Sequence, residues 1–275
     1  MTPVCNICPH RCQLGEGRVG LCRARKNDGG AVTCFNYGMI TSMALDPIEK
    51  KPLARFFPGS TILSVGSWGC NLRCSFCQNS EISMANVESS RAVYVSPEEL
   101  VNKALSLVPR NNIGLAFTYN EPLISYEYVR DCAIIAKKSG LKIVLVTNGM
   151  ICSDPLIELL HLIDAMNIDL KGFTEQFYKK LGGDLETVKQ TIRLSAEKCH
   201  VEITTLIIPG ENDTDGEMDA LSGWLSAIRP DIPLHITRFF PRYRMRDREP
   251  TPINTLYRLR EVAKRHLDYV YIGNI

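Results

Sequence analysis

The chain has 275 residues, of which 45% are hydrophobic and 23% charged, and its formal net charge is only +2. This balance suits a globular protein with a large core, and it lacks the basic excess of a nucleic-acid-binding protein. No apolar run reaches the roughly 20 residues that span a bilayer, and no basic and apolar signal segment opens the chain, so we expect a cytoplasmic protein without a membrane partner.

Residues 1–60 are rich in Cys, Gly and Arg and show little hydrophobic periodicity. A four-ligand set with the spacing C-x2-C-x3-C-x9-C is formed by Cys5, Cys8, Cys12 and Cys22. Disulfides are rare in the cytoplasm, so clustered cysteines there favour a bound metal. Thiolate ligation suits both a tetrahedral zinc ion and a 4Fe-4S cluster, and the spacing leaves both open. Cys34 could replace one of the four ligands.

Residues 61–275 alternate short apolar runs with amphipathic helices. The expected strands are 62–66, 113–117, 142–147, 165–170, 201–208, 234–237 and, more weakly, 269–272. Each run is rich in β-branched residues and nearly continuous. That pattern is typical of strands buried on both faces of a parallel sheet.

Helix signals lie between these strands. Ser96, Pro97 and Glu99 predict a capped helix start, and Thr214 with Glu217 predicts a second capping box. Further helices are expected from about 125 to 138 and from about 154 and 252 onward.

The order of strands and helices predicts right-handed βαβ units in an α/β fold. We expect a partial (β/α)6 TIM-type barrel over residues 61–275, because a full eight-stranded barrel typically needs ~250 residues. Residues 1–60 would form a Cys-rich N-terminal metal-binding extension. The active site should lie at the carboxyl ends of the strands.

The loop after the first expected strand carries Cys70, Cys74 and Cys77 with the spacing C-x3-C-x2-C, and Phe76 precedes the last cysteine. Three thiolates on one loop can hold three irons of a four-iron cluster and leave the fourth iron open. An open metal site can bind and activate a substrate, whereas ligation by four cysteines suits electron transfer. Zinc is the alternative, but a structural zinc site takes a fourth Cys or His nearby.

This loop resembles the signature of the radical S-adenosylmethionine (SAM) superfamily, C-x3-C-x-aromatic-C. The resemblance implies a 4Fe-4S cluster on Cys70, Cys74 and Cys77, whose unique iron binds SAM, with the backbone near Phe76 against the adenine. It further implies that one electron breaks the S–C5′ bond and that a 5′-deoxyadenosyl radical removes hydrogen from a substrate. A flavodoxin- or ferredoxin-type protein would supply the electron.

Other strand ends resemble motifs of glycyl-radical activating enzymes. The residues that this resemblance assigns to SAM binding are Glu121, Thr147, Asn148, Asp169, Lys171 and Ile208. Val146 stands where those enzymes carry Asp. Two structural readings stay open: Glu121 could oppose a helix dipole, and Asp169 with Lys171 could be a structural ion pair.

The cysteine groups, the segment 117–122 and the segment 238–241 together resemble the AmmeMemoRadiSam-system radical SAM enzymes, which are related to pyruvate formate-lyase activating enzymes. The resemblance implies an oxidoreductase that acts on a protein, as in glycyl-radical enzyme activation.

Two other functions remain open. Five arginines within 238–248 could clamp the phosphate or carboxylate of a small-molecule substrate, with Arg238 as the first candidate, although a solvated basic loop is the simpler reading. A non-catalytic iron–sulfur electron carrier is the third hypothesis, and it would bind no SAM.

Overall fold

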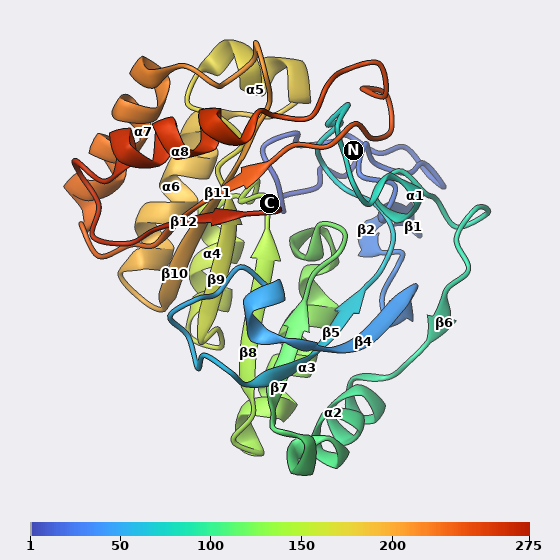
Figure 1. Ribbon diagram of the computed structural model, residues 1–275. Coiled ribbons are helices and arrows are strands. Elements are labelled where there is room, and N and C mark those ends of the chain that lie inside the picture. The colour runs from blue at the N-terminus through green and yellow to red at the C-terminus, as the bar shows by residue number, and fades with distance from the viewer. Residues whose placement is uncertain (1) are drawn as a thin grey trace.

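A computed structural model describes residues 2–275, and Figure 1 shows its ribbon. The centre is an eight-stranded sheet in the order β12-β11-β10-β9-β8-β7-β5-β4. Neighbours from β5 to β12 run parallel. Their bounds are β5 (Thr61–Gly66), β7 (Asn112–Phe117), β8 (Lys142–Thr147), β9 (Ala165–Asp169), β10 (His200–Ile207), β11 (Leu234–Arg238) and β12 (Val270–Gly273). The expected α/β fold of the partial-barrel type is confirmed, and the weaker seventh strand is present.

The eighth strand, β4 (Ser42–Pro47), comes from the N-terminal extension and was not expected. It pairs antiparallel with β5 along its length, from Ser42 opposite Gly66 to Pro47 opposite Thr61. As an edge strand it is only partly buried, and so its sequence lacks the apolar continuity of the inner strands. A division of the chain at residue 60 stays a prediction, and the sheet itself crosses that position.

Two small antiparallel pairs complete the strands. They are β1 (Arg25–Asp28) with β2 (Ala31–Cys34), and β3 (Met39–Ile40) with β6 (Val93–Tyr94). Gly29 and Gly30 join β1 to β2 with φ of 61° and 85°. A two-residue hairpin turn that matches the right-handed twist of its strands needs positive φ at both residues, and glycine adopts such values without strain.

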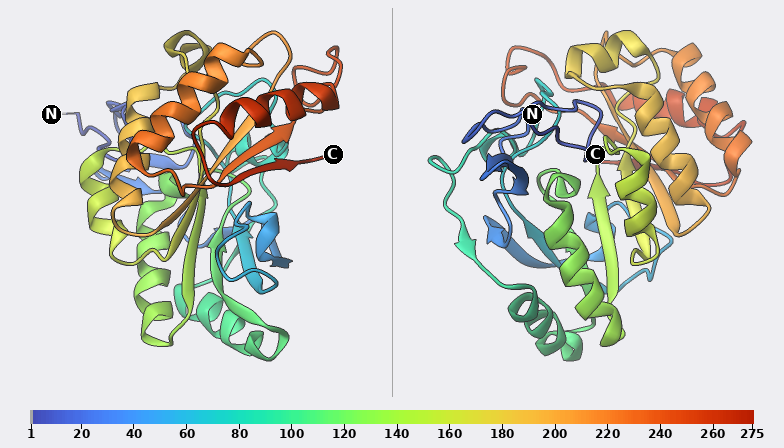
Figure 2. Two further views of the ribbon diagram at one scale, coloured as in Figure 1. Left: turned by 60° about the vertical axis from the view of Figure 1, so that its left-hand side comes forward. Right: turned by 180° about the vertical axis from the view of Figure 1, so that it is seen from behind.

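Helices cover the outer face of the curved sheet, as the views in Figure 2 show. Their bounds are α1 (Ser80–Ser83), α2 (Pro97–Ser106), α3 (Tyr126–Lys138), α4 (Ser153–Leu160), α5 (Glu175–Leu181), α6 (Leu185–Ala196), α7 (Asp215–Ile228) and α8 (Ile253–Ala263). Three 3-10 turns are η1 (Ile48–Lys50), η2 (Val108–Arg110) and η3 (Pro122–Ser125).

The first of the two expected capping boxes is confirmed, because the Ser96 hydroxyl accepts the Glu99 N–H while the Glu99 carboxylate accepts the Ser96 N–H. The second capping box, at Thr214, has only one of its two hydrogen bonds. Thr214 accepts the Glu217 N–H, but the Glu217 carboxylate accepts the N–H of Phe173 at 2.6 Å. Glu217 therefore ties the loop after β9 to α7, a contact that local sequence cannot specify.

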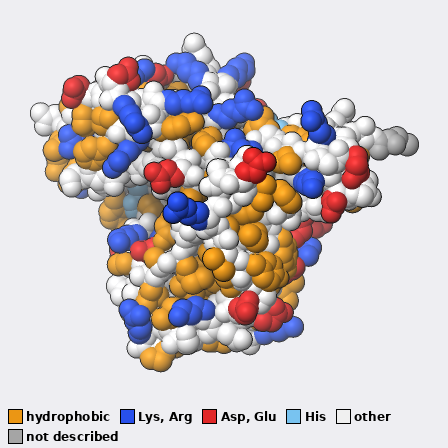
Figure 3. Space-filling view, turned by 90° about the vertical axis from the view of Figure 1, so that its right-hand side faces the viewer, with side chains coloured by type: hydrophobic (Ala, Val, Ile, Leu, Met, Phe, Trp, Pro, Cys, Tyr) orange, Lys and Arg blue, Asp and Glu red, His pale blue; other side chains and the backbone are white. Residues whose placement is uncertain are grey.

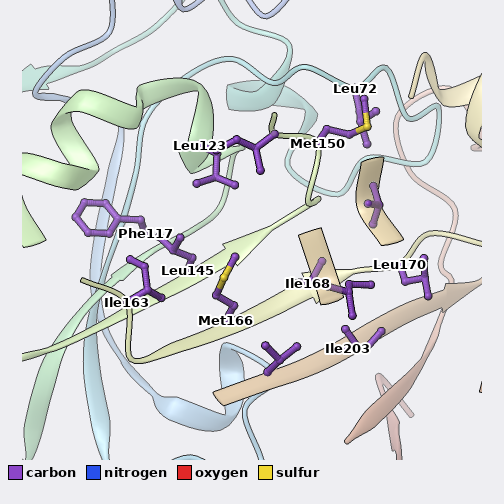
Figure 4. Close-up of a cluster of buried hydrophobic side chains, with 14 of the residues drawn as sticks. Leu72, Phe117, Leu123, Leu145, Met150, Ile163, Met166, Ile168, Leu170 and Ile203 are labelled. Carbon is purple, nitrogen blue, oxygen red and sulfur yellow. The ribbon is translucent and has the colours of Figure 1, made fainter. Parts of the chain in front are cut away.

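The core lies between the strands and the helices, and Figure 4 shows part of it. Leu145, Met166, Ile168 and Ile203 are fully buried there. A buried side chain of this size stabilises the fold by about 1.5–3 kcal/mol. Figure 4 also places Leu72, from the loop after β5, beside Met150, so the cysteine-bearing loop is anchored in the core.

The surface carries mixed charge. On the face in Figure 3, Lys and Arg side chains are interspersed with acidic and hydrophobic ones, in line with the small net charge. Within residues 2–275, no helix is both long and apolar enough to cross a bilayer.

Candidate active site

A cavity of about 330 Å³ opens at the carboxyl ends of the parallel strands, within the usual size of a small-molecule or cofactor site. The expected site residues that line it are Cys70, Cys74, Phe76, Cys77, Glu121, Thr147, Asn148, Asp169 and Lys171. They come from the loop after β5 and from the ends of β7, β8 and β9. The structure thus gathers around one space residues that lie up to 101 positions apart, from Cys70 to Lys171.

The loop after β5 is held by contacts that no motif indicated. The Asn120 side-chain amide donates to the carbonyls of Trp68 and Gly69 at 3.2 and 3.1 Å, and its oxygen accepts the Ser67 N–H at 3.0 Å. Gly69 has φ of 91°, and a Cβ at this position would lie 2.4 Å from the carbonyl oxygen of Cys22. Only glycine fits there, because the loop turns sharply while touching the N-terminal extension.

The three thiols of this loop are mostly enclosed. The Cys70 sulfur accepts weak hydrogen bonds from the Leu72 N–H at 3.4 Å and the Asn148 amide at 3.5 Å. Burial raises the pKa of the Cys74 thiol to about 12, although the nearby Lys171 charge opposes this rise. Iron ligation needs the thiolate, so metal binding at this loop would release protons.

Glu121 is a buried carboxylate at the end of β7. It accepts the Leu123 N–H, the Thr147 hydroxyl and the Asn148 N–H at 3.0, 2.7 and 2.8 Å. Burial raises its pKa to about 7, and these hydrogen bonds oppose the rise. A carboxylate has about four lone-pair sites, so one remains for a ligand in the cavity. The three bonds also fix Thr147 and Asn148 at the end of β8.

Asp169 and Lys171 form an ion pair of 2.6 Å at the end of β9, and both line the cavity. Burial alone would lower the pKa of Lys171, but the negative charge of Asp169 and the hydrogen bond to it raise the pKa above its ordinary value. Lys171 therefore stays cationic. One of its three ammonium donors is used by Asp169, which leaves donors for a ligand carboxylate.

Two expected site residues do not line the cavity. Ile208 is fully buried, and its N–H donates to the Asn212 side chain at 2.8 Å. Arg238 donates from Nε to the carbonyl of Thr251 at 2.8 Å, and its guanidinium lies 4.9 Å from the centre of the Phe240 ring. Their assigned contacts with SAM and substrate stay predictions.

The N-terminal extension contributes an unexpected wall. Lys50 and Pro52 line the cavity, and so does Tyr119. The Tyr119 hydroxyl donates to Asp46 of β4 at 2.7 Å, and Lys51 pairs with the same carboxylate oxygen at 2.9 Å. Asp46 sits on an edge strand that the sequence did not reveal, and Lys51 follows the 3-10 turn η1 directly after it, so the pattern offered no signal for them.

The four cysteines of the extension also come together. Cys5, Cys8, Cys12 and Cys22 line a second, small cavity, whose wall includes Arg25 and Ile124. Cys34 does not line it and instead donates to Asn36 at 3.3 Å. Within residues 2–275, no three Cys, His, Asp or Glu side chains are grouped as ligands of one metal ion.

Comparison with known proteins identifies the class. The family model of the radical SAM superfamily matches residues 66–221. An uncharacterized protein of Methanocaldococcus jannaschii is 41% identical over 98% of this chain and 81% of its own length. The chain therefore belongs to the radical SAM superfamily, which uses a 4Fe-4S cluster and SAM, and the three-cysteine loop lies inside the matched region.

More distant relatives have named activities. The pyruvate formate-lyase 1-activating enzyme of Escherichia coli is 27% identical over 54% of this chain and 61% of that enzyme. Streptococcus suis SuiB, solved with the precursor peptide SuiA, matches 76% of this chain and 47% of its own with a TM-score of 0.61 and 12% identity. QueE of Escherichia coli matches 86% of this chain and 94% of its own with a TM-score of 0.52 and 14% identity. The two structures support the fold alone.

Proposed function

We propose that this protein is a radical SAM enzyme that cleaves SAM and uses the 5′-deoxyadenosyl radical to remove a hydrogen atom from a protein or peptide. The observation that carries the proposal is the single cavity in which Cys70, Cys74 and Cys77 face Glu121 and Lys171. Three thiols, one buried carboxylate and one partly buried cation match the needs of an open iron cluster and a bound amino acid end of SAM.

The donor set fits the cluster that the superfamily implies. Three cysteines on one loop can hold three irons, and the cavity beside them leaves room at the fourth. When bound, a reduced 4Fe-4S cluster supplies the electron that breaks the S–C5′ bond of SAM. We assign the source of this electron to a flavodoxin- or ferredoxin-type protein in the cytoplasm, where eleven free thiols stay reduced.

The chain's own residues would bind and orient SAM. Glu121, with one acceptor site left, would take the amino group. Lys171, with donors left beside Asp169, would take the carboxylate, because a charge-assisted hydrogen bond is about twice as strong as a neutral one. Phe76 lines the cavity and stacks parallel to Phe177 with 6.3 Å between ring centres, so it offers an apolar wall to the adenine.

A macromolecular substrate is supported by the relatives named pyruvate formate-lyase activating enzymes. The arginine cluster gives no support to a small anionic substrate, because Arg238 is turned to Thr251 and Arg248 pairs with Glu211 at 3.0 Å. Val146, where the activases carry Asp, makes part of the cavity wall apolar. We therefore place the substrate among proteins or peptides, and leave its sequence to experiment.

The test is anaerobic reconstitution with iron and sulfide, reduction in the presence of SAM, and chromatography of 5′-deoxyadenosine. We expect 5′-deoxyadenosine from the wild type and from Cys132→Ala, a buried cysteine of α3, and none from Cys74→Ala. A fully loaded cluster that produces no 5′-deoxyadenosine, and whose EPR signal SAM leaves unchanged, would establish an electron carrier instead.

The substrate class is tested by dividing a cell extract into desalted macromolecules and a low-mass filtrate. The macromolecular fraction should raise 5′-deoxyadenosine formation, and a glycine target would show an EPR doublet on the partner protein. Stimulation by the filtrate alone would favour a small-molecule substrate and contradict this part of the proposal.

A further inference from the structure

The four cysteines of the N-terminal extension form a closed pocket of their own. The Cys5 N–H donates to the Cys12 carbonyl at 2.9 Å and the Arg11 N–H to the Cys8 carbonyl at 3.2 Å, so this short segment loops back on itself. The loop and Cys22 then line one small cavity. Gly20 lies against its wall, since a Cβ there would be 3.7 Å from the Cys12 sulfur.

Arg25 supplies a second and independent observation at this cavity. It lines the wall, and only 4% of its surface is exposed. Its terminal nitrogens pair with both carboxylate oxygens of Glu127 at 2.7 Å. Its Nε–H is buried and has no hydrogen-bond partner within residues 2–275. Leaving a buried donor unpaired is unfavourable, so an acceptor bound in the cavity would relieve that cost.

We propose that this cavity binds a 4Fe-4S cluster through Cys5, Cys8, Cys12 and Cys22, and that Arg25 donates its free Nε–H to a sulfur of that cluster. The four cysteines line one small cavity, and within residues 2–275 no three of them are grouped as the ligands of a single metal ion. Ligands of a cluster stand apart in this way, at the corners of the group they hold. The ligands of a single zinc ion instead meet at one point, each about 2.3 Å from the metal. The guanidinium also balances the negative charge that four thiolates bring.

Ligation by four cysteines gives this cluster a different function from that of the cluster on Cys70, Cys74 and Cys77. No iron is left open for SAM, so the cluster is suited to carry electrons. Its site lies against the back of the loop after β5. The His10 ring is hydrogen-bonded at 2.8 Å to the carbonyl of Asn71, the residue after Cys70. On the other side, Gly69 is in contact with the Cys22 backbone.

These contacts between the two cysteine-lined sites lead us to assign electron uptake to the second cluster, a role that rests on the proposed function. The cluster held by Cys5, Cys8, Cys12 and Cys22 would take one electron from the reduced flavodoxin- or ferredoxin-type donor and would supply it to the cluster held by Cys70, Cys74 and Cys77. The donor is oxidised by one electron and the catalytic cluster is reduced by one. No atom or proton moves between the two centres.

The first experiment isolates the second site. A variant with Cys70→Ala, Cys74→Ala and Cys77→Ala is reconstituted with iron, sulfide and zinc, and its metals are counted. We expect about four irons per chain and, after reduction, the EPR signal of a 4Fe-4S cluster. In the matched variant Cys5→Ala/Cys22→Ala, this iron should be lost and the catalytic cluster kept. A folded triple variant that binds one zinc, or no metal, would overturn the cluster.

The role of Arg25 is tested by redox titration of the triple variant. Arg25→Lys keeps a positive charge but removes the Nε–H, and Arg25→Met removes both. We expect the midpoint potential to become more negative in the order wild-type Arg25, Lys, Met, with iron content unchanged. Glu127→Gln is the control, because it weakens the ion pair and leaves the Nε–H in place. Equal potentials in all these variants, with losses of stability alone, would show that Arg25 only fastens the extension to α3.

Electron uptake is tested by the rate at which the catalytic cluster is reduced, followed by EPR on freeze-quenched samples without substrate. With reduced flavodoxin as donor, Cys5→Ala/Cys22→Ala should slow this reduction at least tenfold, whereas dithionite should reduce both proteins at similar rates. Equal rates with flavodoxin would overturn the relay while leaving the iron count to decide the cluster. If the wild type fails to form 5′-deoxyadenosine but retains both clusters, the proposed function fails and the second cluster stands.

Discussion

Two buried glutamates lie at opposite ends of the sheet, and their surroundings shift their pKa values in opposite directions. Glu121 follows the carboxyl end of β7, accepts three hydrogen bonds from neutral groups and faces the cavity, and burial raises its pKa to about 7. Glu202 lies near the amino end of β10 and is completely enclosed. Burial alone would raise its pKa too, but hydrogen bonds from His200, His235 and two backbone N–H groups lower it to about 2.

This difference in hydrogen-bond partners distinguishes Glu121, which can still bind a ligand, from Glu202, which stabilises the fold. Glu202 accepts from the Ala54 and Arg55 N–H groups at 2.9 and 2.8 Å, so it fastens the extension beneath the sheet. All of its partners belong to the chain. Glu121 has no cationic partner in the parts of the chain that the structure describes. A carboxylate held in this way gains most when a ligand brings a donor to it.

The largest effect on stability should follow from loss of the Glu202 charge near the amino end of β10. Glu202→Gln replaces an acceptor oxygen with a donor that faces N–H groups or a histidine. We expect the free energy of unfolding at pH 7 to fall by about 3 kcal/mol, the value of a pKa shift of this size. SAM affinity of the folded protein should stay unchanged. Denaturant melts measure this, with the exposed Glu186→Gln as control, and a loss below 1 kcal/mol would contradict it.

The same glutamate predicts a pH dependence. Its folded-state pKa of about 2 lies below the ordinary value of 4.5, so the folded state holds fewer protons than the unfolded state between these values. Its stabilisation is therefore present above pH 4.5 and disappears as the pH falls toward 2. The difference in unfolding free energy between wild type and Glu202→Gln should shrink over this window. His200, His235 and the backbone N–H groups of Ala54 and Arg55 donate to the carboxylate, and a difference that stays constant down to pH 2 would show that these hydrogen bonds do not lower its pKa.

For Glu121, at the carboxyl end of β7, we expect a loss of SAM affinity. Glu121→Gln should weaken SAM binding about 30-fold, or 2 kcal/mol, because a hydrogen bond to a charged acceptor is lost. The free energy of unfolding should change by less than about 1 kcal/mol, since the amide avoids the cost of a buried charge. SAM binding to the reconstituted protein is measured by the change in the cluster EPR signal. If Glu121→Gln instead destabilises the fold as much as Glu202→Gln, the contrast between the two ends is wrong.

What the sequence predicted well was local. The parallel strands were visible as apolar runs, and the C-x3-C-x2-C spacing placed three thiols on one loop at a strand end. The alternation of side chains along a strand explains why Arg238 does not line the cavity: its neighbour Thr237 does, so Arg238 points to the other face, and its contact with substrate stays a prediction. Ile208 lies just beyond β10, where the chain turns at Pro209 and leaves the cavity.

What the sequence could not predict depends on contacts between distant segments. β4 is recognised only by its pairing with β5, since an edge strand has no continuous apolar pattern of its own. Asn120 and Glu217 act on backbone groups more than 40 positions away, at Trp68 and Phe173. Arg25 meets Glu127 across 102 positions. An asparagine or arginine that supports a loop in this way has the same local sequence as one on the surface.

The smallest effect we predict at the site concerns Lys171. In Lys171→Met, Asp169 loses its partner, and the carboxylate end of SAM would lose one charged donor, while the three cysteines that would hold the cluster stay unchanged. We expect SAM affinity to fall about tenfold, or 1.4 kcal/mol. Lys180→Met is the matched control, because Lys180 forms a comparable 2.7 Å ion pair with Glu211 but is 56% exposed. A double variant with Asp169→Asn removes the unpaired carboxylate. If that variant restores SAM affinity, the pair is structural and Lys171 does not bind SAM; if affinity stays low, Lys171 acts on the ligand directly.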